Sequence, residues 1–126
     1  MKRETIHSER APAAIGSYSQ AVAAGGFVFL SGQIGFDPTK GELVAGGLEA
    51  EARRVFGNLA AVATAAGGNL GDIVKLTVYL ADLGDYAKFN ELMREHFEEP
   101  YPARAVVEVS ALPRGARIEI EAILAR

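Results

Sequence analysis

The sequence has no cysteine and no tryptophan, and its 126 residues include only two histidines. The absence of cysteine excludes disulfides, thiolate nucleophiles and zinc sites with cysteine ligands. His96, Glu98 and Pro100 reproduce the start of the zinc-deaminase motif, H-x-E followed by P-C-x-x-C, but no cysteine is present to complete the ligand shell. A Ser-His-Asp triad also lacks a histidine in a suitable setting. These absences favour a site without metal or cofactor, built from arginine, glutamate, hydroxyl and backbone groups.

Long apolar runs and clusters of basic residues are also missing. The longest mainly apolar runs, AVAAGGFVFL and LAAVATAA, fall short of the ~20 residues that a membrane-spanning helix needs. The charged N-terminus, MKRETIHSER, has no apolar core of a secretory signal, which predicts a cytoplasmic protein by default. With a net charge of −3 and scattered Lys and Arg residues, the chain lacks the electrostatic pattern of a nucleic-acid-binding protein. We therefore expect neither a membrane nor a nucleic acid among its partners.

What the chain does contain is the composition of an ordinary globular domain. It is 49% hydrophobic and 23% charged, and no repeat, charge run or low-complexity linker divides it. We therefore predict one domain over residues 1–126. The stretches GGFVFLSGQIG and AAGGNLGD match neither the dinucleotide motif nor the P-loop, so we interpret their glycines as turn residues.

The hydrophobic pattern of the first half predicts two strands and a helix. Strands are expected near Ser19–Ala23 and over Phe27–Ser31, followed by a turn at DPTKG. From Leu48 to Ala66, apolar residues recur every three or four positions, which predicts a helix. Gly67 and Gly68 are the candidates to end that helix.

The second half of the chain predicts a strand, a helix and two more strands. DIVKLTVYLADL alternates as a strand does, and Asp85 can cap a following helix over YAKFNELMREHF. Pro100 and Pro102 end this helix because proline has no backbone N–H to donate. Strands then follow in ARAVVEVS and RIEIEAILA. This order predicts an α+β fold in which two helices pack on one face of a mixed sheet of about four to six strands.

Alternation divides the strands between an apolar face for the helices and a second, mixed face. To the second face we assign Lys75, Thr77, Tyr79, Arg104, Val106, Glu108, Glu119, Glu121 and Ile123. A fully solvated face would rarely carry valine and isoleucine. We therefore expect this face to be partly buried against another copy of the chain.

Arg104 stands out because its guanidinium stays charged at any accessible pH, yet it begins an apolar strand. One interpretation is an edge arginine paired with Glu119 or Glu121, a pair that contributes ~0–1 kcal/mol. The other is an anion receptor, since the planar fork can bind a carboxylate through two parallel hydrogen bonds. Near such a receptor, Ser31 and Gly32 can present N–H groups from a strand end. Alternation alone leaves both interpretations open.

Four stretches resemble the reactive intermediate deaminase A family, the RidA or YjgF-like proteins, in both order and spacing. They are APAAIGSYSQAV, FLSGQIG, GDIVKLTVYLADL and YPARAVVEVSALPRGARIEIEAI, and the similarity covers essentially the whole chain. The resemblance implies a chorismate-mutase-like α+β fold and a homotrimer with its sites between subunits. It also implies cofactor-free hydrolysis of 2-aminoacrylate, 2-iminopropanoate and 2-iminobutanoate, which gives 2-oxo acids and ammonia.

The same resemblance assigns roles to individual residues. Arg104 matches the arginine that grips the substrate carboxylate, and Glu119 matches the glutamate that positions or activates water. Two departures are Ser17, where the family often has proline, and Val106, where it often has cysteine. The alternative is a member of the same fold that binds small carboxylates without turnover, acts as a chaperone or associates with RNA. Residues that match the lining of the cleft are Tyr18, Ser31, Gly32, Asn90 and, through its backbone carbonyl, Val106.

Overall fold

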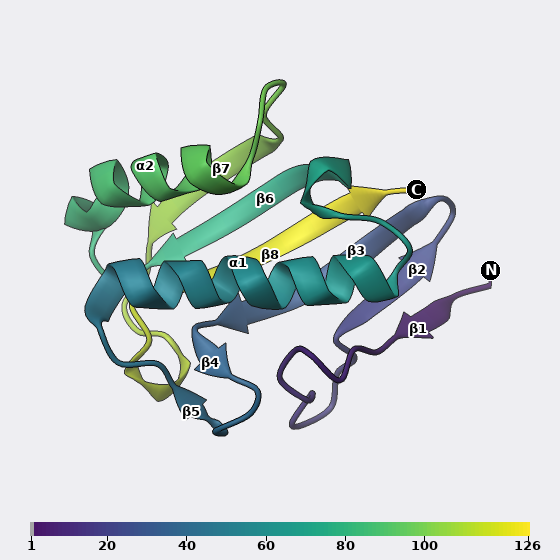
Figure 1. Ribbon diagram of the computed structural model, residues 1–126, viewed down its shortest axis with the longest axis horizontal. Coiled ribbons are helices and arrows are strands. Elements are labelled where there is room, and N and C mark those ends of the chain that lie inside the picture. The colour runs from purple at the N-terminus through teal and green to yellow at the C-terminus, as the bar shows by residue number, and fades with distance from the viewer. Residues whose placement is uncertain (1) are drawn as a thin grey trace.

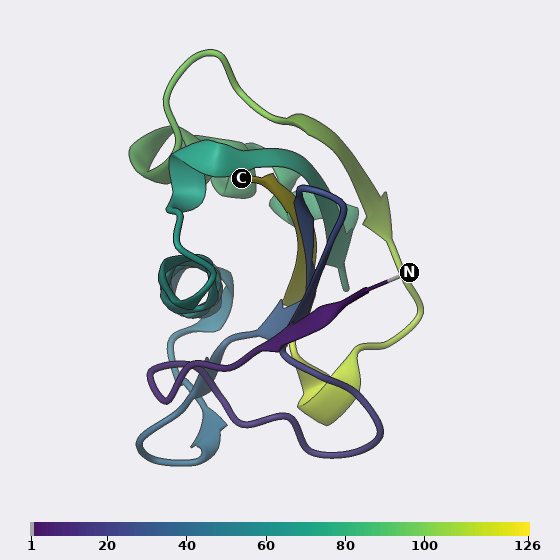
Figure 2. The same cartoon turned by 90° about the vertical axis from the view of Figure 1, so that its right-hand side faces the viewer.

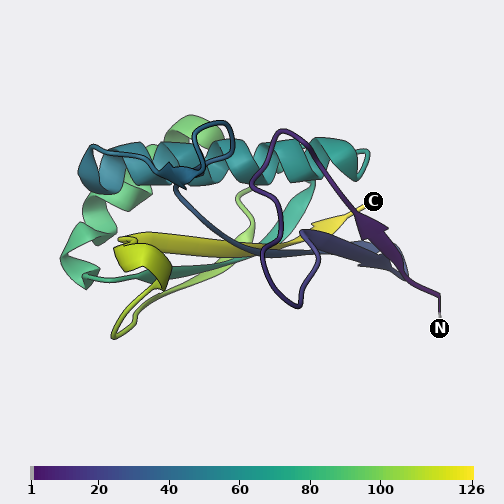
Figure 3. The same ribbon diagram turned by 90° about the horizontal axis from the view of Figure 1, so that it is seen from below.

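The computed structural model describes residues 2–126, which form a curved six-stranded sheet with two helices on one face (Figure 1; Figure 3). The strand order across the sheet is β1-β2-β3-β8-β6-β7, and a separate hairpin of β4 and β5 follows β3. The helices are α1 (Gly47–Ala65) and α2 (Tyr86–His96). The strands are β1 (Glu4–Ile6), β2 (Ala21–Ala24), β3 (Phe27–Ile34), β4 (Phe36–Asp37), β5 (Glu42–Leu43), β6 (Ile73–Leu80), β7 (Ala103–Glu108) and β8 (Ile118–Ala125).

The chain connectivity explains why the sheet is mixed. Neighbouring strands of the large sheet run antiparallel except β6 and β7, which run parallel. Helix α2 connects these two strands, because parallel neighbours need a crossover that returns the chain to the same end of the sheet. The predicted α+β class, with two helices on one face of a mixed sheet, is therefore confirmed.

Helix α1 lies inside the curve of the sheet and contacts β3, β8 and α2 (Figure 2). Its apolar stripe is buried there, as the spacing of the apolar residues predicts. The helix ends where Gly67 takes a φ of +88°, a left-handed conformation that glycine adopts without steric cost. The Gly67 N–H donates to Thr64 O at 3.0 Å, and the Gly68 N–H donates to Ala63 O at 2.9 Å. This pair of bonds is a Schellman motif, so both glycines end the helix as predicted.

Several elements differ from the sequence-based expectation. Strand β3 continues past Ser31 to Ile34, and β1 and the β4–β5 hairpin were not predicted because two or three residues are too few for alternation to show. Asp85 precedes α2, but its side chain makes no capping hydrogen bond. Instead Asp82 accepts from the Gly84 N–H at 2.8 Å and caps the short turn of helix before α2.

The assignment of Arg104, Val106 and Glu108 to the second face is wrong. In the parallel register of β6 and β7, Arg104 lies beside Leu76, Val106 lies beside Val78, and Glu108 lies beside the buried Leu80. Leu76 and Val78 are fully buried under the helices, and Val106 packs against the same core. These three residues of β7 therefore belong to the helix-covered face. Alternation separates the two faces of a strand but does not say which one the helices cover.

The opposite face of the sheet is open in the single chain. Glu119 and Glu121 of β8 lie beside Tyr79 and Thr77 of β6 on this face. Large apolar residues are also exposed in the neighbouring strands, since Phe29 is 47% exposed. Association of this face with further copies of the chain stays a prediction. Within residues 2–126, no helix has the length and hydrophobicity needed to cross a membrane.

Candidate functional site

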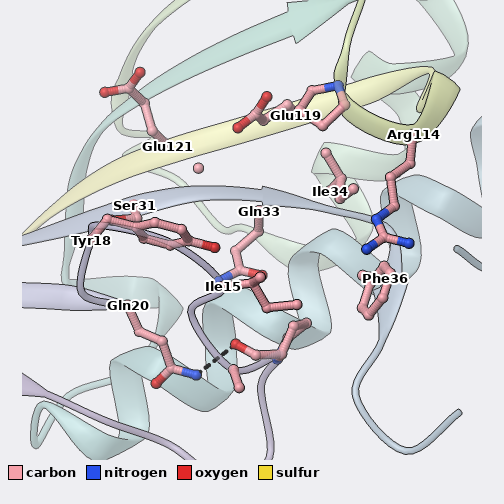
Figure 4. Close-up of a pocket in the computed structure, with 14 residues that line it drawn as sticks. Ile15, Tyr18, Gln20, Ser31, Gln33, Ile34, Phe36, Arg114, Glu119 and Glu121 are labelled. Atoms are coloured by element: carbon pink, nitrogen blue, oxygen red, sulfur yellow. Dashed lines mark hydrogen bonds between the residues drawn. The ribbon is translucent and has the colours of Figure 1, made fainter. Parts of the chain in front are cut away.

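A pocket of about 540 Å³ lies where β3 and β8 meet the loop that precedes β2 (Figure 4). Glu119 projects into it from β8, and Tyr18 stands on the opposite wall. Ser31 and Gly32 of β3 line the pocket between Glu119 and Tyr18. Four of the residues predicted for the site are thus brought together. The complete lining is Pro12, Ala13, Ile15, Tyr18, Gln20, Ser31, Gly32, Gln33, Ile34, Phe36, Pro113, Arg114, Glu119 and Glu121.

A β-bulge shapes this pocket. Leu30 pairs with Ala122 and Gln33 pairs with Ile120, so that two residues of β3, Ser31 and Gly32, oppose one residue of β8. Such bulges bend a strand and redirect its side chains, and they are frequent next to active sites.

The Glu119 carboxylate lies directly against Gly32. A Cβ built at Gly32 would clash with the Oε2 atom of Glu119, so a larger residue here would displace the end of the glutamate side chain. The absence of a side chain at Gly32 therefore lets the carboxylate lie against the main chain of the bulge.

The expectation that Ser31 presents a free N–H group to a ligand is wrong. The Ser31 N–H donates to Gln20 O at 2.9 Å, and the Ser31 hydroxyl donates to Ser19 O at 2.6 Å. Both groups attach the end of the Tyr18 loop to β3, because the strand continues through Ser31 instead of ending there. Ser31 consequently positions the aromatic wall of the pocket.

Gln20 is a residue of this site that sequence reasoning missed. Its side chain is 3% exposed, and its Nε2 donates to Pro12 O at 2.7 Å and to Ser8 O at 3.1 Å (Figure 4). Its Oε1 accepts from the Ser8 N–H at 2.6 Å. These bonds hold the loop over residues 8–20 in one conformation and so fix the rim of the pocket. The glutamine follows a loop and precedes a strand, and no pattern in the sequence distinguishes it from a surface residue.

Glu119 has the electrostatic properties of a proton-transfer group. Burial raises the pKa of its carboxyl above the ordinary value of 4.5, and the nearby Glu121 carboxylate raises this pKa further. Glu121 is itself oriented by the Tyr79 hydroxyl, which donates to its Oε1 at 2.6 Å. A carboxyl with a raised pKa in a partly closed pocket can accept a proton from water and return it.

Arg104 lies in a second and smaller pocket of about 210 Å³ on the helix-covered face. Its guanidinium donates to the Tyr86 hydroxyl at 2.7 Å and to Met93 Sδ at 3.1 Å. It also lies over the aromatic rings of Tyr86 and Phe89, with its Cζ at 5.5 and 5.7 Å from their centroids. Within residues 2–126, no carboxylate lies within 4.0 Å of it. The second pocket is lined by Asn90, Met93, Arg94, Tyr101, Pro102 and Arg104.

The contacts of Arg104 exclude the edge pair with Glu119 or Glu121 within one chain, and the anion receptor stays a prediction. Neither Glu119 nor Glu121 can bind it in the same chain, because both lie on the opposite face of the sheet. Tyr86, Phe89 and Met93 of α2 hold the guanidinium in place but give it no counter-charge. Sequence reasoning did not identify Tyr86, although its place on the apolar side of the predicted helix was a signal that it faces the sheet.

The predicted site residues therefore divide into two groups. Tyr18, Ser31, Gly32 and Glu119 line the first pocket, whereas Asn90 and Arg104 line the second. Val106 lines neither, and its side chain packs against the core beside Arg104. Within residues 2–126, no group of three or more histidine, aspartate or glutamate side chains is arranged to hold a metal ion. The metal- and cofactor-free site stays a prediction.

The sequence and the fold place this chain among known proteins. A family model described as endoribonuclease L-PSP matches residues 8–126. The chain belongs to this family. A 2-iminobutanoate/2-iminopropanoate deaminase of Mus musculus is 48% identical over 121 residues, which are 96% of this chain and 90% of the mouse protein. The resemblance to the RidA family is confirmed by this relative and by two crystal structures.

Both crystal structures share the fold over nearly the whole chain. RidA from an Antarctic Psychrobacter is 52% identical, with a TM-score of 0.94 over 98% of this chain and 99% of that one. The structure of Escherichia coli TdcF with bound serine is 43% identical, with a TM-score of 0.91 over 98% of each chain. The proteins that this chain resembles thus include a named imine deaminase and a protein crystallised with serine bound.

Proposed function

We propose that this L-PSP family member is a hydrolytic deaminase of 2-iminopropanoate and 2-iminobutanoate, the imines that form from enamines such as 2-aminoacrylate. The observation that supports this most directly is Glu119, a half-buried carboxyl with a raised pKa that lies against the bulge at Gly32. Arg104 supplies a preorganised cation without a counter-charge, which suits a substrate carboxylate. The name of the mouse relative and the serine bound to TdcF agree with this chemistry.

The two groups must come from different copies of the chain. Within one chain, Arg104 and Glu119 lie on opposite faces of one sheet, so no single substrate can reach both. We propose that three copies associate through the open face of the sheet, which exposes Phe27, Phe29 and Val107. Because β7 is the edge strand of the sheet, the Arg104 pocket at this edge of one copy then adjoins the Glu119 pocket of its neighbour. Asn90 and the Val106 carbonyl reach the substrate from the same copy as Arg104.

The reaction begins when Arg104 binds the carboxylate of the imine. The imine reacts as its protonated iminium form. Glu119 accepts a proton from a water molecule as the water oxygen forms a bond to C2, and the electron pair of the C=N bond moves to nitrogen, which gives a neutral carbinolamine. Glu119 then returns its proton to nitrogen, the C–N bond breaks with its electron pair going to nitrogen, and ammonia leaves. The hydroxyl releases its proton to solvent as the carbonyl forms, which returns the proton that the iminium took up. Water and imine are thus converted to a 2-oxo acid and ammonia, and Glu119 ends the cycle in its original ionised state.

The residues present are sufficient for a reaction of this difficulty. Imines hydrolyse spontaneously in water, so the enzyme needs only a moderate reduction of the barrier. A positioned acid/base group contributes ~10²–10⁴-fold, and the orientation of the substrate adds more.

A dehydratase assay tests the proposal. A pyridoxal-phosphate threonine dehydratase generates 2-iminobutanoate, and the rate at which 2-oxobutanoate appears is measured with and without catalytic amounts of this protein. We expect acceleration by the wild type, a loss of ~10²-fold or more in Glu119→Gln, and a comparable loss in Arg104→Ala. Arg3→Ala, which removes an exposed arginine outside both pockets, serves as the matched control and keeps full activity.

Two outcomes contradict the proposal. If 2-oxobutanoate binds in a calorimetric titration but the wild type gives no acceleration, the protein is a sensor of small carboxylates. Unchanged turnover in Arg104→Ala, with the oligomeric state preserved in light scattering, removes the role assigned to the arginine.

A further inference from the structure

The pocket around Glu119 extends well beyond the space that a three- or four-carbon imino acid needs. Its volume of about 540 Å³ lies within the ~300–1,000 Å³ of sites that bind much larger ligands. In Figure 4, Tyr18 and Ser31 lie on one side of Glu119, and Ile34, Phe36 and Arg114 lie on the other. The proposed reaction uses only the first side. The second side has an apolar wall and ends in a guanidinium.

Arg114 has an unusual backbone conformation. It has a φ of +58°, the only positive φ of a residue other than glycine within residues 2–126. It lies in a short helical turn, Pro113–Gly115, immediately before β8. The Gly115 N–H donates to Leu112 O at 3.2 Å, and the Ala116 N–H donates to Pro113 O at 3.1 Å. A residue other than glycine in the left-handed region is uncommon, and such strained positions cluster at binding sites.

The Arg114 side chain is held by an aromatic ring and has no carboxylate partner. Its Cζ lies 4.9 Å from the centroid of the Phe36 ring, and Ile34 lies on the same side of Glu119. Within residues 2–126, no aspartate or glutamate oxygen lies within 4.0 Å of its guanidinium. Elsewhere on the surface, arginines do form such pairs, as Arg53 does with Glu49 and Glu95.

We propose that Arg114 binds a second, distal carboxylate of the substrate, so that the protein also accepts 2-imino dicarboxylates with an apolar linker. This inference rests on the proposed imine hydrolysis. Arg104 of a neighbouring copy binds the carboxylate next to the imine, and Glu119 accepts a proton from the water that attacks C2. The linker of the substrate lies along Ile34 and Phe36, and the distal carboxylate reaches the Arg114 fork. The distal carboxylate takes no part in bond making or breaking, so the same bonds form and break as in the hydrolysis of 2-iminobutanoate.

Charge also favours this assignment. Each Glu119 pocket carries two carboxylates, Glu119 and Glu121, and one guanidinium, Arg114. A second carboxylate on the substrate would be repelled from this pocket without that guanidinium. Arg114 offsets the repulsion at the end that lies farther along the pocket, and its planar fork can accept a carboxylate through two hydrogen bonds.

The test compares two imino acids that differ only in the distal group. A flavin-dependent amino acid oxidase converts glutamate to its dicarboxylic imine and norvaline to a neutral imine with the same main chain. Formation of the 2-oxo acid is followed for the wild type, Arg114→Met, Arg114→Lys and Lys40→Met. Methionine keeps an unbranched apolar stem without the charge, and lysine keeps the charge without the fork. Lys40→Met removes a positive charge from the exposed turn between β4 and β5 and is the matched control.

We expect Arg114→Met to lower kcat/KM for the dicarboxylic imine by roughly tenfold while changing that for the neutral imine by about twofold or less. Arg114→Lys should fall between these limits, and Lys40→Met should resemble the wild type with both substrates. As a readout without turnover, glutarate should inhibit the wild type more strongly than it inhibits Arg114→Met.

Four results overturn the inference. An equal loss with both imines in Arg114→Met shows a structural role, and no loss with either shows no role. Wild-type hydrolysis of the neutral imine without hydrolysis of the dicarboxylic imine rejects the substrate class and leaves the proposed function intact. Absence of acceleration with both imines in the wild type rejects the proposed function itself, and the role of Arg114 with it.

Discussion

The hydrogen bond between Tyr86 and Arg104 allows a sharp test of how the carboxylate receptor is built. Tyr86→Phe removes the hydroxyl that accepts from the guanidinium at 2.7 Å but keeps the ring that lies 5.5 Å from Cζ. Tyr86 is 40% exposed, so water can replace the lost acceptor in part. A hydrogen bond to a charged group is worth ~1.5–3 kcal/mol when buried. For this exposed bond we expect about 1 kcal/mol, which corresponds to about a fivefold fall in kcat/KM.

The effect should be confined to KM. Arg104 holds the same carboxylate in the ground state and in the transition state, so a less ordered guanidinium weakens both equally and leaves kcat unchanged. Tyr86→Leu also removes the cation–π contact and should lower kcat/KM by a further factor of about two to five, since such contacts contribute ~0.5–1 kcal/mol at exposed sites. The assay is the threonine dehydratase assay described above, with substrate concentration varied.

Lys88→Met is the control for these variants because Lys88 lies on the exposed side of α2 and pairs only with surface glutamates. It should leave both kinetic constants unchanged. A fall in kcat at constant KM in Tyr86→Phe would refute the reasoning. So would a lower KM, because it would mean that the Tyr86 hydroxyl competes with the substrate for the guanidinium.

Three further predictions concern the acid group and the assembly. Ionised Glu119 is the base and its pKa is raised, so activity should fall as the pH drops through this raised pKa. Glu121→Gln removes the carboxylate that contributes to the raised pKa and should move the fall in a pH–rate profile to lower pH. An unchanged profile would exclude coupling of the two carboxyls. Because the pKa of Glu119 is higher in the folded protein than its ordinary value of 4.5, ionisation of this carboxyl destabilises the fold at pH values above 4.5. Glu119→Gln should therefore raise the thermal unfolding temperature at pH 7, and the difference from the wild type should disappear in acid. Phe29→Asp places a charge on the open face, where Phe29 is 47% exposed. It should give an inactive monomer with unchanged circular dichroism, whereas an intact trimer would exclude this face as the interface.

Much of the secondary structure could be predicted because it depends on local periodicity. The stripe of α1 and the alternation of β6 and β8 follow from side-chain geometry in each element. Gly67 marks the end of α1 because glycine adopts the left-handed conformation without steric cost. The short strands β1, β4 and β5 carry too few residues for any period to show. They form because a longer neighbour supplies their hydrogen-bond partners.

The residue types of the candidate site were also set by the sequence, but their arrangement was not. Arg104 and Glu119 carry the charge and the proton-transfer group whatever the fold, since these are properties of the side chains. The register of β7 against β6 decided that Arg104 lies under α2 beside Tyr86, on the opposite face from Glu119. The bulge at Ser31 and Gly32 likewise depends on how β3 meets β8. A strand pattern with a period of two defines two faces, and only packing between distant segments determines which face is covered and what each side chain meets there.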